Sequence, residues 1–203
     1  MRESPRIRRL RSDLKALEAL KRESTILAFK TQGNPPDEYL VRFHGKGFAR
    51  SPDGEDVQVQ EDNEVRICLG ASYPREMPEM HWRTPIFHPN ISGAGTVCLG
   101  GYGTFWVPSL NLDELCEMLW DMIRYQNFDV TSPYNRDAAE WAKYQRKYKF
   151  PIDPRPIRDK LAEALPISKP KRVVAAEVLF LDDEVTDVEK TSRRNPPNLF
   201  LIE

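Results

Sequence analysis

A cysteine stands in a glycine-rich stretch near the middle of the chain, where its surroundings allow nucleophilic chemistry. The stretch runs from His88 to Pro108 and reads HPNISGAGTVCLGGYGTFWVP, with Cys98 at its centre. Its scattered glycines disfavour a continuous helix or strand, so we expect a surface loop. A thiol on such a loop, between small neighbours, can be reached by a large reaction partner. The competing interpretation is a structural thiol, because free cysteines usually behave as small buried apolar side chains.

Composition and motifs exclude several other classes of function. A P-loop would end in Gly-Lys-Ser/Thr, and Gly93-x-Gly95-x-x-Cys98 lacks the third glycine of a dinucleotide-binding turn. The 30 basic and 31 acidic residues give a formal net charge of −1, which argues against a nucleic-acid-binding protein. The three cysteines, at 68, 98 and 116, form neither a disulfide framework nor a zinc spacing, so we expect no metal. The odd count fits a reducing compartment. The chain carries no signal peptide and no long apolar run, so we expect a cytoplasmic protein without a membrane partner.

The spacing around Cys98 resembles the active-site region of ubiquitin-conjugating enzymes. Members of that family carry His-Pro-Asn, a cysteine eight positions after the Asn, and Trp and Pro eight and ten positions after the cysteine. The corresponding residues here are Asn90, Cys98, Trp106 and Pro108. The resemblance covers roughly residues 5–150, because residues on both sides also agree in order: Tyr73, Pro74, Pro78, Thr84, Ile86, His88, Asn127, Pro133 and 135–139.

The resemblance implies that Cys98 accepts ubiquitin or a ubiquitin-like modifier as a thioester and passes it to an amine, most often a lysine of a protein substrate. A thiol suits both steps, because a thiolate attacks thioesters well and leaves well. Asn90 is expected either to donate a hydrogen bond to the oxyanion or to brace the loop. Ser132 and Asp129 compete as the group that receives the proton of the incoming amine. The reaction implies no cofactor.

Two further groups of residues are expected to bind partner proteins. The basic face of the N-terminal helix, including Arg6, Arg8 and Arg9, corresponds to the surface on which the family meets the activating enzyme; the alternative is a merely solvated face. Arg75 stands where many members place an aromatic residue for ligase contact, and Pro108 lies on the second ligase-contact loop. If a ligase takes part, Arg75 predicts that its contact surface is acidic or polar.

Local patterns predict an α+β fold with an N-terminal helix, a four-stranded antiparallel meander, an active-site loop and C-terminal helices. Apolar residues at helical spacing and capping residues mark the helices, and runs rich in β-branched and aromatic residues mark the strands. Cys68 and Cys116 are predicted to lie in the core, and His44 and His81 to be structural. The predicted helices cover residues 4–22, 111–123, 135–149 and 157–165, and the predicted strands cover 25–31, 39–48, 65–69 and 80–84.

The length of 203 residues favours one domain plus an extension. We expect a catalytic domain over residues 1–150 and an extension over 151–203, with a short helix and a strand near 173–181.

Two other functions are compatible with parts of the sequence. A non-catalytic binding module with the same fold would be indicated by loss of Cys98 or of His-Pro-Asn. A thiol redox protein would need a resolving cysteine close to Cys98 in the sequence.

Overall fold

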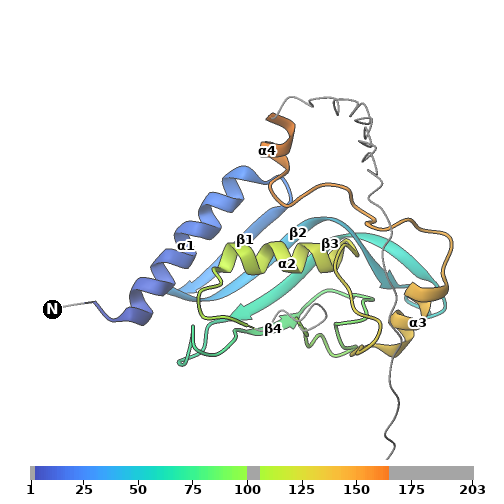
Figure 1. Ribbon diagram of the computed structural model, residues 1–203, viewed down its shortest axis with the longest axis horizontal. Helices are drawn as coiled ribbons and strands as arrows, with labels where there is room; N and C mark the ends of the chain where they lie inside the picture. Colours follow the sequence, from blue (N-terminus) through green and yellow to red (C-terminus); the bar gives the residue numbers. More distant parts are fainter. Residues whose placement is uncertain (1–2, 100–105, 165–203) are drawn as a thin grey trace, which may run out of the picture. The chain divides into compact units, whose positions relative to one another are not determined.

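A computed structural model describes residues 3–99 and 106–164 of the chain (Figure 1). One four-stranded sheet has the order β1-β2-β3-β4, and each neighbouring pair is antiparallel. The predicted α+β fold, with an N-terminal helix, a meander and later helices, is confirmed. The elements are α1 (Pro5–Glu23), β1 (Leu27–Gly33), β2 (Pro36–Arg50), β3 (Val57–Cys68), β4 (Glu79–Trp82), α2 (Leu112–Ile123), α3 (Arg136–Tyr144) and α4 (Asp159–Ala164).

Strand β3 begins at Val57, eight residues before the strand start expected at residue 65. The added residues are mostly polar and carry little strand signal of their own. They are strand because the β2–β3 hairpin extends outward, pairing Arg50 with Val57 and Phe43 with Asn63. A register shift between His44 and Gly47 lets the long hairpin bend. Pairing within the β2–β3 hairpin therefore determines where β3 begins.

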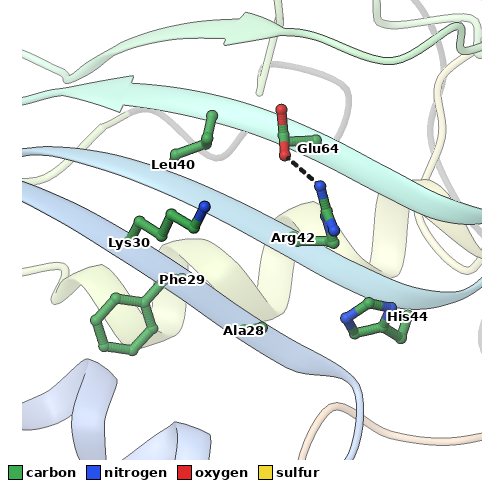
Figure 2. Close-up of a pocket in the computed structure, with 7 residues that line it drawn as sticks. All are labelled: Ala28, Phe29, Lys30, Leu40, Arg42, His44 and Glu64. Atoms are coloured by element: carbon green, nitrogen blue, oxygen red, sulfur yellow. Dashed lines mark hydrogen bonds and ion pairs between the residues drawn. The ribbon is translucent and has the colours of Figure 1, made fainter.

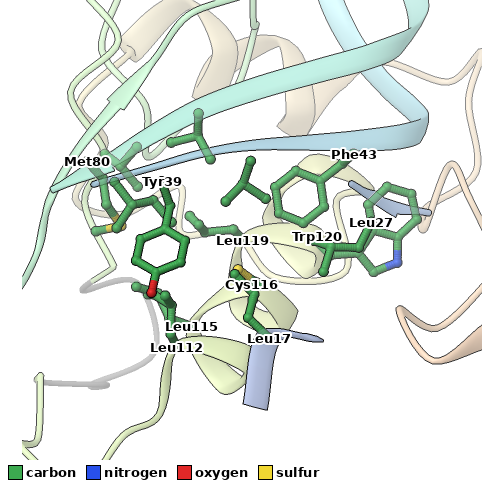
Figure 3. Close-up of a cluster of buried hydrophobic side chains, with 14 of the residues drawn as sticks. Leu17, Leu27, Tyr39, Phe43, Met80, Leu112, Leu115, Cys116, Leu119 and Trp120 are labelled. Atoms are coloured by element: carbon green, nitrogen blue, oxygen red, sulfur yellow. The ribbon is translucent and has the colours of Figure 1, made fainter. Parts of the chain in front are cut away.

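Helix α2 lies across one face of the sheet and forms the core with it (Figures 1 and 3). Alternate residues of β2 point toward the helix, as the period of two requires, and Tyr39, Val41 and Phe43 are fully buried. The rings of Phe43 and Trp120 stack with centroids 6.3 Å apart. Cys116 is fully buried beside them, which confirms the predicted core position, and burial raises the pKa of its thiol.

Cys68 was also predicted to lie in the core, and that prediction is only partly correct. The residue is half-buried because it occupies the last position of β3. It pairs there with Glu38 of β2 and Glu79 of β4, near the end of the sheet. The apolar neighbours Ile67 and Leu69 are buried, whereas Cys68 points to the other face.

Helix α3 ends at Tyr144, before the expected end at residue 149. The side chain of Gln145 accepts a hydrogen bond from the Tyr148 amide (2.8 Å) and donates one to the Tyr148 carbonyl (3.0 Å), which closes a turn. This turn brings the rings of Tyr148 and Phe150 against Phe48, at centroid distances of 4.8 and 6.1 Å. Burial of these rings in a second aromatic cluster opposes continuation of the helix.

Arg158 and Asp159, which lie within the predicted C-terminal extension, contact earlier parts of the chain. The carboxylate of Asp159 accepts a hydrogen bond from the Thr25 amide (2.7 Å), and Arg158 pairs with Asp113 (2.8 Å). The described residues, 3–99 and 106–164, belong to one compact unit. The strand expected near 173–181 lies outside the described residues. None of the helices within residues 3–99 and 106–164 is both long and apolar enough to cross a membrane.

A buried carboxylate joins α1 to the start of α2 and to the turn after β3. Asp13 is fully buried, and its Oδ2 atom accepts hydrogen bonds from the Tyr73 hydroxyl (2.7 Å) and from Arg9 Nε (2.9 Å). Its Oδ1 atom accepts from the Leu112 amide at the start of α2 (3.2 Å). Burial of a charge is tolerated here because the carboxylate is paired and hydrogen-bonded.

We predict that Asp13→Asn lowers the free energy of unfolding by about 3 kcal/mol, the scale for removing one partner of a buried ion pair. The substitution leaves the Arg9 guanidinium, whose side chain is only 15% exposed, without its counter-ion. Urea unfolding followed by tryptophan fluorescence measures the loss. Glu18→Gln, on the exposed face of the same helix, is the control and should change stability by less than about 0.5 kcal/mol. Equal effects in the two variants would contradict the role of the buried pair.

Candidate functional site

The backbone around Cys98 is fixed by its own neighbours, while the side chain keeps access to solvent. The Cys98 amide donates to the Asn90 carbonyl (2.9 Å). Ile91 forms isolated bridges with His88 and Val97, and Ile91 and Val97 are both buried. The Cys98 side chain itself is only half-buried. The thiol therefore stands at the edge of a folded segment and can meet a reaction partner.

Gly95 sets how closely this segment approaches β4. Its φ of +85° belongs to the left-handed region, and a Cβ atom there would lie 2.5 Å from the Trp82 carbonyl oxygen. The Trp82 amide donates to the Gly95 carbonyl (2.8 Å), and Gly95 closes a turn back to Ser92. This glycine is required by both conformation and space, and it anchors the chain three residues before the thiol.

Asn90 connects the thiol segment to the loop between α2 and α3. Its Oδ1 atom accepts from the Asp129 amide (2.7 Å), and its Nδ2 atom donates to the Asp129 carbonyl (3.1 Å). The side chain is buried. The oxygen and the nitrogen of the Asn90 side chain are thus both hydrogen-bonded to the backbone of Asp129. This geometry braces the Asp129 loop against the thiol segment. Of the two roles expected for Asn90, donation to an oxyanion stays a prediction and would have to use the second Nδ2 hydrogen.

His88 supports the same brace from within the fold. Its Nδ1 atom accepts from the Asn90 amide (3.1 Å), and its ring packs edge-on against Tyr125 at 4.9 Å. Burial lowers the pKa of His88 to about 3, so the imidazole is neutral at neutral pH. A neutral, fully buried ring cannot act as the cationic partner of a thiolate.

The loop between α2 and α3 carries both candidate proton acceptors. The Asp129 carboxylate accepts from the Thr131 amide (2.7 Å) and hydroxyl (2.6 Å). These hydrogen bonds lower the pKa of Asp129, so it is ionised at neutral pH and is a weaker base than an ordinary aspartate. The backbone of Asp129 is bound to Asn90, which ties this residue to the thiol segment. Ser132 is exposed on the same loop.

Tyr134 belongs to the site, although no motif marked it. Its backbone amide donates to the Pro89 carbonyl (2.8 Å), and its side chain is 54% exposed. Negative charge on the Cys98 sulfur would raise the pKa of the Tyr134 hydroxyl. The only sequence signal for it is an aromatic residue immediately after Ser132-Pro133 in an otherwise polar stretch.

The basic residues expected to bind the activating enzyme divide into two groups. Arg8 is exposed on α1. Arg6 instead donates to the Leu69 carbonyl (2.9 Å), and Arg9 donates to the Pro108 carbonyl. Arg6 and Arg9 therefore hold neighbouring loops in place, and Arg8 remains the free charge of the three.

The residues expected to contact a ligase lie on two joined loops. Arg75 is exposed in the turn after β3, and Val107 and Pro108 are exposed before α2. Trp106 Nε1 donates to the Pro74 carbonyl (2.8 Å), which connects the two loops. Arg75 and Pro108 can consequently belong to one surface.

A shallow pocket opens on the sheet face opposite α2 (Figure 2). Its polar side chains include Arg42 and Glu64, which form an ion pair of 3.1 Å across β2 and β3. The expected site residues do not line it: the lining residues are Ala28, Phe29, Lys30, Leu40, Arg42, His44 and Glu64. The candidate site is therefore the thiol segment and not this pocket.

Comparison with known proteins agrees with this geometry. Residues 60–152 match the family model of the ubiquitin-conjugating enzymes, and they include both the thiol segment and the loop that braces it. Over these residues the chain is similar to the ubiquitin-conjugating enzymes. The resemblance seen around Cys98 is thus confirmed.

Individual relatives of the family are distant. Ubiquitin-conjugating enzyme E2 16 of Schizosaccharomyces pombe is 38% identical over 75 residues, which are 36% of this chain and 46% of the relative. NEDD8-conjugating enzyme Ubc12 of Dictyostelium discoideum is 35% identical over 74 residues, which are 36% of this chain and 31% of the relative. The chain thus spans less than half the length of each. The structure of S. cerevisiae Ubc12 superposes with a TM-score of 0.55 at 22% identity, covering 71% of this chain and 72% of that one, and supports the fold.

We predict that Asn90→Ala destabilises the protein by about 1–2 kcal/mol, because it leaves the amide and carbonyl of Asp129 without partners. Asn90→Asp retains an acceptor for the Asp129 amide but sets an oxygen against the Asp129 carbonyl, so it should also be destabilised. Thermal unfolding measures the difference, and hydrogen exchange at the Asp129 amide reports the brace directly. An Asn90→Ala protein with unchanged stability and unchanged protection of that amide would contradict the brace.

Proposed function

We propose that this protein accepts ubiquitin or a ubiquitin-like modifier as a thioester on Cys98 and then transfers it to an amine. The observation that carries the proposal is a half-exposed thiol on a segment braced by Asn90, in a chain similar to the ubiquitin-conjugating enzymes. Since a free thiol nucleophile needs reducing conditions, we place the reaction in the cytoplasm.

In the first step the Cys98 thiolate attacks the thioester carbonyl of the charged activating enzyme, and the enzyme's own sulfur leaves with the electron pair. In the second step a neutral lysine amine attacks the carbonyl carbon of the new thioester. The C–N bond forms, the C–S bond breaks, and the Cys98 sulfur leaves as a thiolate. The attacking nitrogen must lose a proton. We assign that proton to the Asp129 carboxylate, which is ionised and bound through its backbone to the thiol segment; Ser132 is the other candidate.

The partners follow from the same proposal. Arg8 supplies exposed positive charge on α1 for the activating enzyme. Arg75 and Pro108 form a surface for a ligase, which should present an acidic or polar group to Arg75. A protein lysine is the acceptor. The names of the relatives include both ubiquitin-conjugating and NEDD8-conjugating enzymes, so both modifiers belong in the first assay.

Incubation with ATP, activating enzyme and ubiquitin or NEDD8 should give a thiol-sensitive adduct on a non-reducing gel. Cys98→Ala should abolish this adduct, and Cys98→Ser should give a slower, thiol-resistant ester, because an alkoxide is a much poorer leaving group. Cys68→Ala, which removes the other partly exposed thiol, is the control and should charge normally. An adduct that persists in Cys98→Ala would refute the assignment. A wild-type protein that never charges, whichever modifier is supplied, would instead favour the non-catalytic binding module.

Arg8→Glu should slow charging about threefold to tenfold at low ionic strength without changing the melting temperature, because exposed charges act on association rate. The defect should shrink as salt is raised. Lys30→Glu, on the opposite sheet face, applies the same change in net charge as a control. Equal rates for the two variants would mean that the α1 face is only solvated.

A further inference from the structure

A cavity of about 400 Å³ opens beside the turn at residues 92–95, three to six residues before Cys98 in the chain. The side chains of Arg50 and Arg83 line it, and none of the described residues that line it is acidic. Neither of the two proposed reaction steps uses this cavity. Two guanidinium groups without a carboxylate beside them in the lining suit an anionic ligand group.

Arg83 carries the less engaged of the two charges. Its backbone amide donates to the Glu64 carbonyl (2.7 Å), which fixes the main chain. Its side chain is exposed and forms no hydrogen bond or ion pair with residues 3–99 and 106–164. Arg50 is partly engaged, since it donates to the Gly54 carbonyl (3.0 Å) and lies 3.7 Å from the Asp137 carboxylate. These contacts leave some of its N–H donors free.

Strand β4 runs beside the thiol segment in antiparallel orientation. His81 and Thr96 form a bridge, and the Trp82 amide donates to the Gly95 carbonyl at 2.8 Å. Side chains of paired strands alternate between two faces. Trp82 and Gly95 are buried, whereas His81 and Thr96 lie on the exposed face.

The same exposed face carries Arg83 and Cys98. Arg83 lies two residues after His81, and Cys98 lies two residues after Thr96, so each keeps the orientation of that neighbour. Because the two segments are antiparallel, these steps lead in opposite directions along the face. The positions of Arg83 and Cys98 are therefore separated by about four residues of strand, or roughly 13 Å. An extended peptide covers the same span in about four residues.

We propose that Arg83, assisted by Arg50, binds an acidic side chain of the acceptor protein about four residues from the lysine that attacks the Cys98 thioester. This inference rests on the proposed function and names its substrate class, which is an extended segment with Asp or Glu at that spacing. The lysine amine meets the thioester carbonyl while the carboxylate lies against the guanidinium groups of the cavity. The contact transfers no proton; it holds the acceptor segment in place for the attack.

Single-turnover discharge of the Cys98 thioester to synthetic acceptor peptides tests the spacing. Each peptide has an acetylated N-terminus, one lysine, and either glutamate or glutamine four residues before or after that lysine. In one of the two orientations, the glutamate peptide should react about threefold faster than its glutamine counterpart at low ionic strength, the scale of an exposed ion pair. Added salt should reduce this preference. Equal rates for glutamate and glutamine peptides, or a stronger preference at a spacing of two residues, would overturn the proposal.

Two substitutions connect the preference to the cavity. Arg83→Glu should abolish the preference for glutamate and favour, about twofold, a peptide with arginine at that position. Arg22→Glu, in the exposed last turn of α1, is the control and should keep the wild-type preference. Gly93→Asp adds a carboxylate to the cavity where an added Cβ atom meets nothing within 4 Å, and it should also remove the preference. Gly93→Asn is its neutral match and should retain it. A glutamate preference that survives Arg83→Glu would overturn the proposal.

Binding to the uncharged protein separates this inference from the proposed function. Titration with the glutamate peptide should shift the amide NMR signals of Gly93 and Ala94, and the glutamine peptide should shift them less. Absence of charging by the activating enzyme would refute the proposed function but would leave this titration intact. A protein that charges normally and shows no shift at either amide would overturn this inference alone.

Discussion

The pair of hydrogen bonds between the Asn90 side chain and the Asp129 backbone is the constraint on which the candidate site depends. These bonds join a segment from before α2 to a loop from after it, across 39 residues of chain. Together with the hydrogen bonds from the Tyr134 and Asn135 amides to the Pro89 carbonyl, they hold the loop that carries Asp129 against the thiol segment. With them, Cys98, Asp129 and Tyr134 share one frame, since Tyr134 is bound to Pro89 and Cys98 to Asn90. A reaction that relies on positioning more than on a charged catalytic pair needs such a frame.

A second frame lies at the other end of the thiol segment and is built around a buried charge. Asp13 holds Arg9 and Tyr73, and Arg9 in turn holds the Pro108 carbonyl. Helix α1 therefore supports the loops that carry Arg75 and Pro108. The two frames differ in their physics. The Asp13 frame depends on a buried ion pair and is costly to break, whereas the Asn90 frame uses hydrogen bonds between neutral groups. This contrast is why Asp13→Asn is expected to lower the free energy of unfolding more than Asn90→Ala.

The structure differs most from the sequence-based predictions at the surfaces expected to bind partner proteins. The basic residues of the N-terminal helix suggested one docking face, yet Arg6 and Arg9 turn toward backbone carbonyls of neighbouring loops. Long basic side chains satisfy buried carbonyls well, and a helical pattern does not reveal which of them do so. Arg8 keeps its charge in solvent because it points away from those loops.

The sequence by itself determined the family resemblance, the order of helices and strands, and Cys98 as the candidate nucleophile, because these depend on local periodicity, capping residues and motif spacing. It also placed Cys116 in the core through the apolar face of α2. Only the tertiary structure decided the early start of β3, the early end of α3, the half-exposure of Cys68, the division of the arginines, and the place of Tyr134 beside the thiol segment. Each of these depends on a partner far away in the chain: a hairpin strand, an aromatic cluster, a sheet end, a loop carbonyl, or the carbonyl of Pro89. Such contacts leave no periodic trace in the sequence, since the free energy that fixes them comes from burial and hydrogen bonding between distant segments.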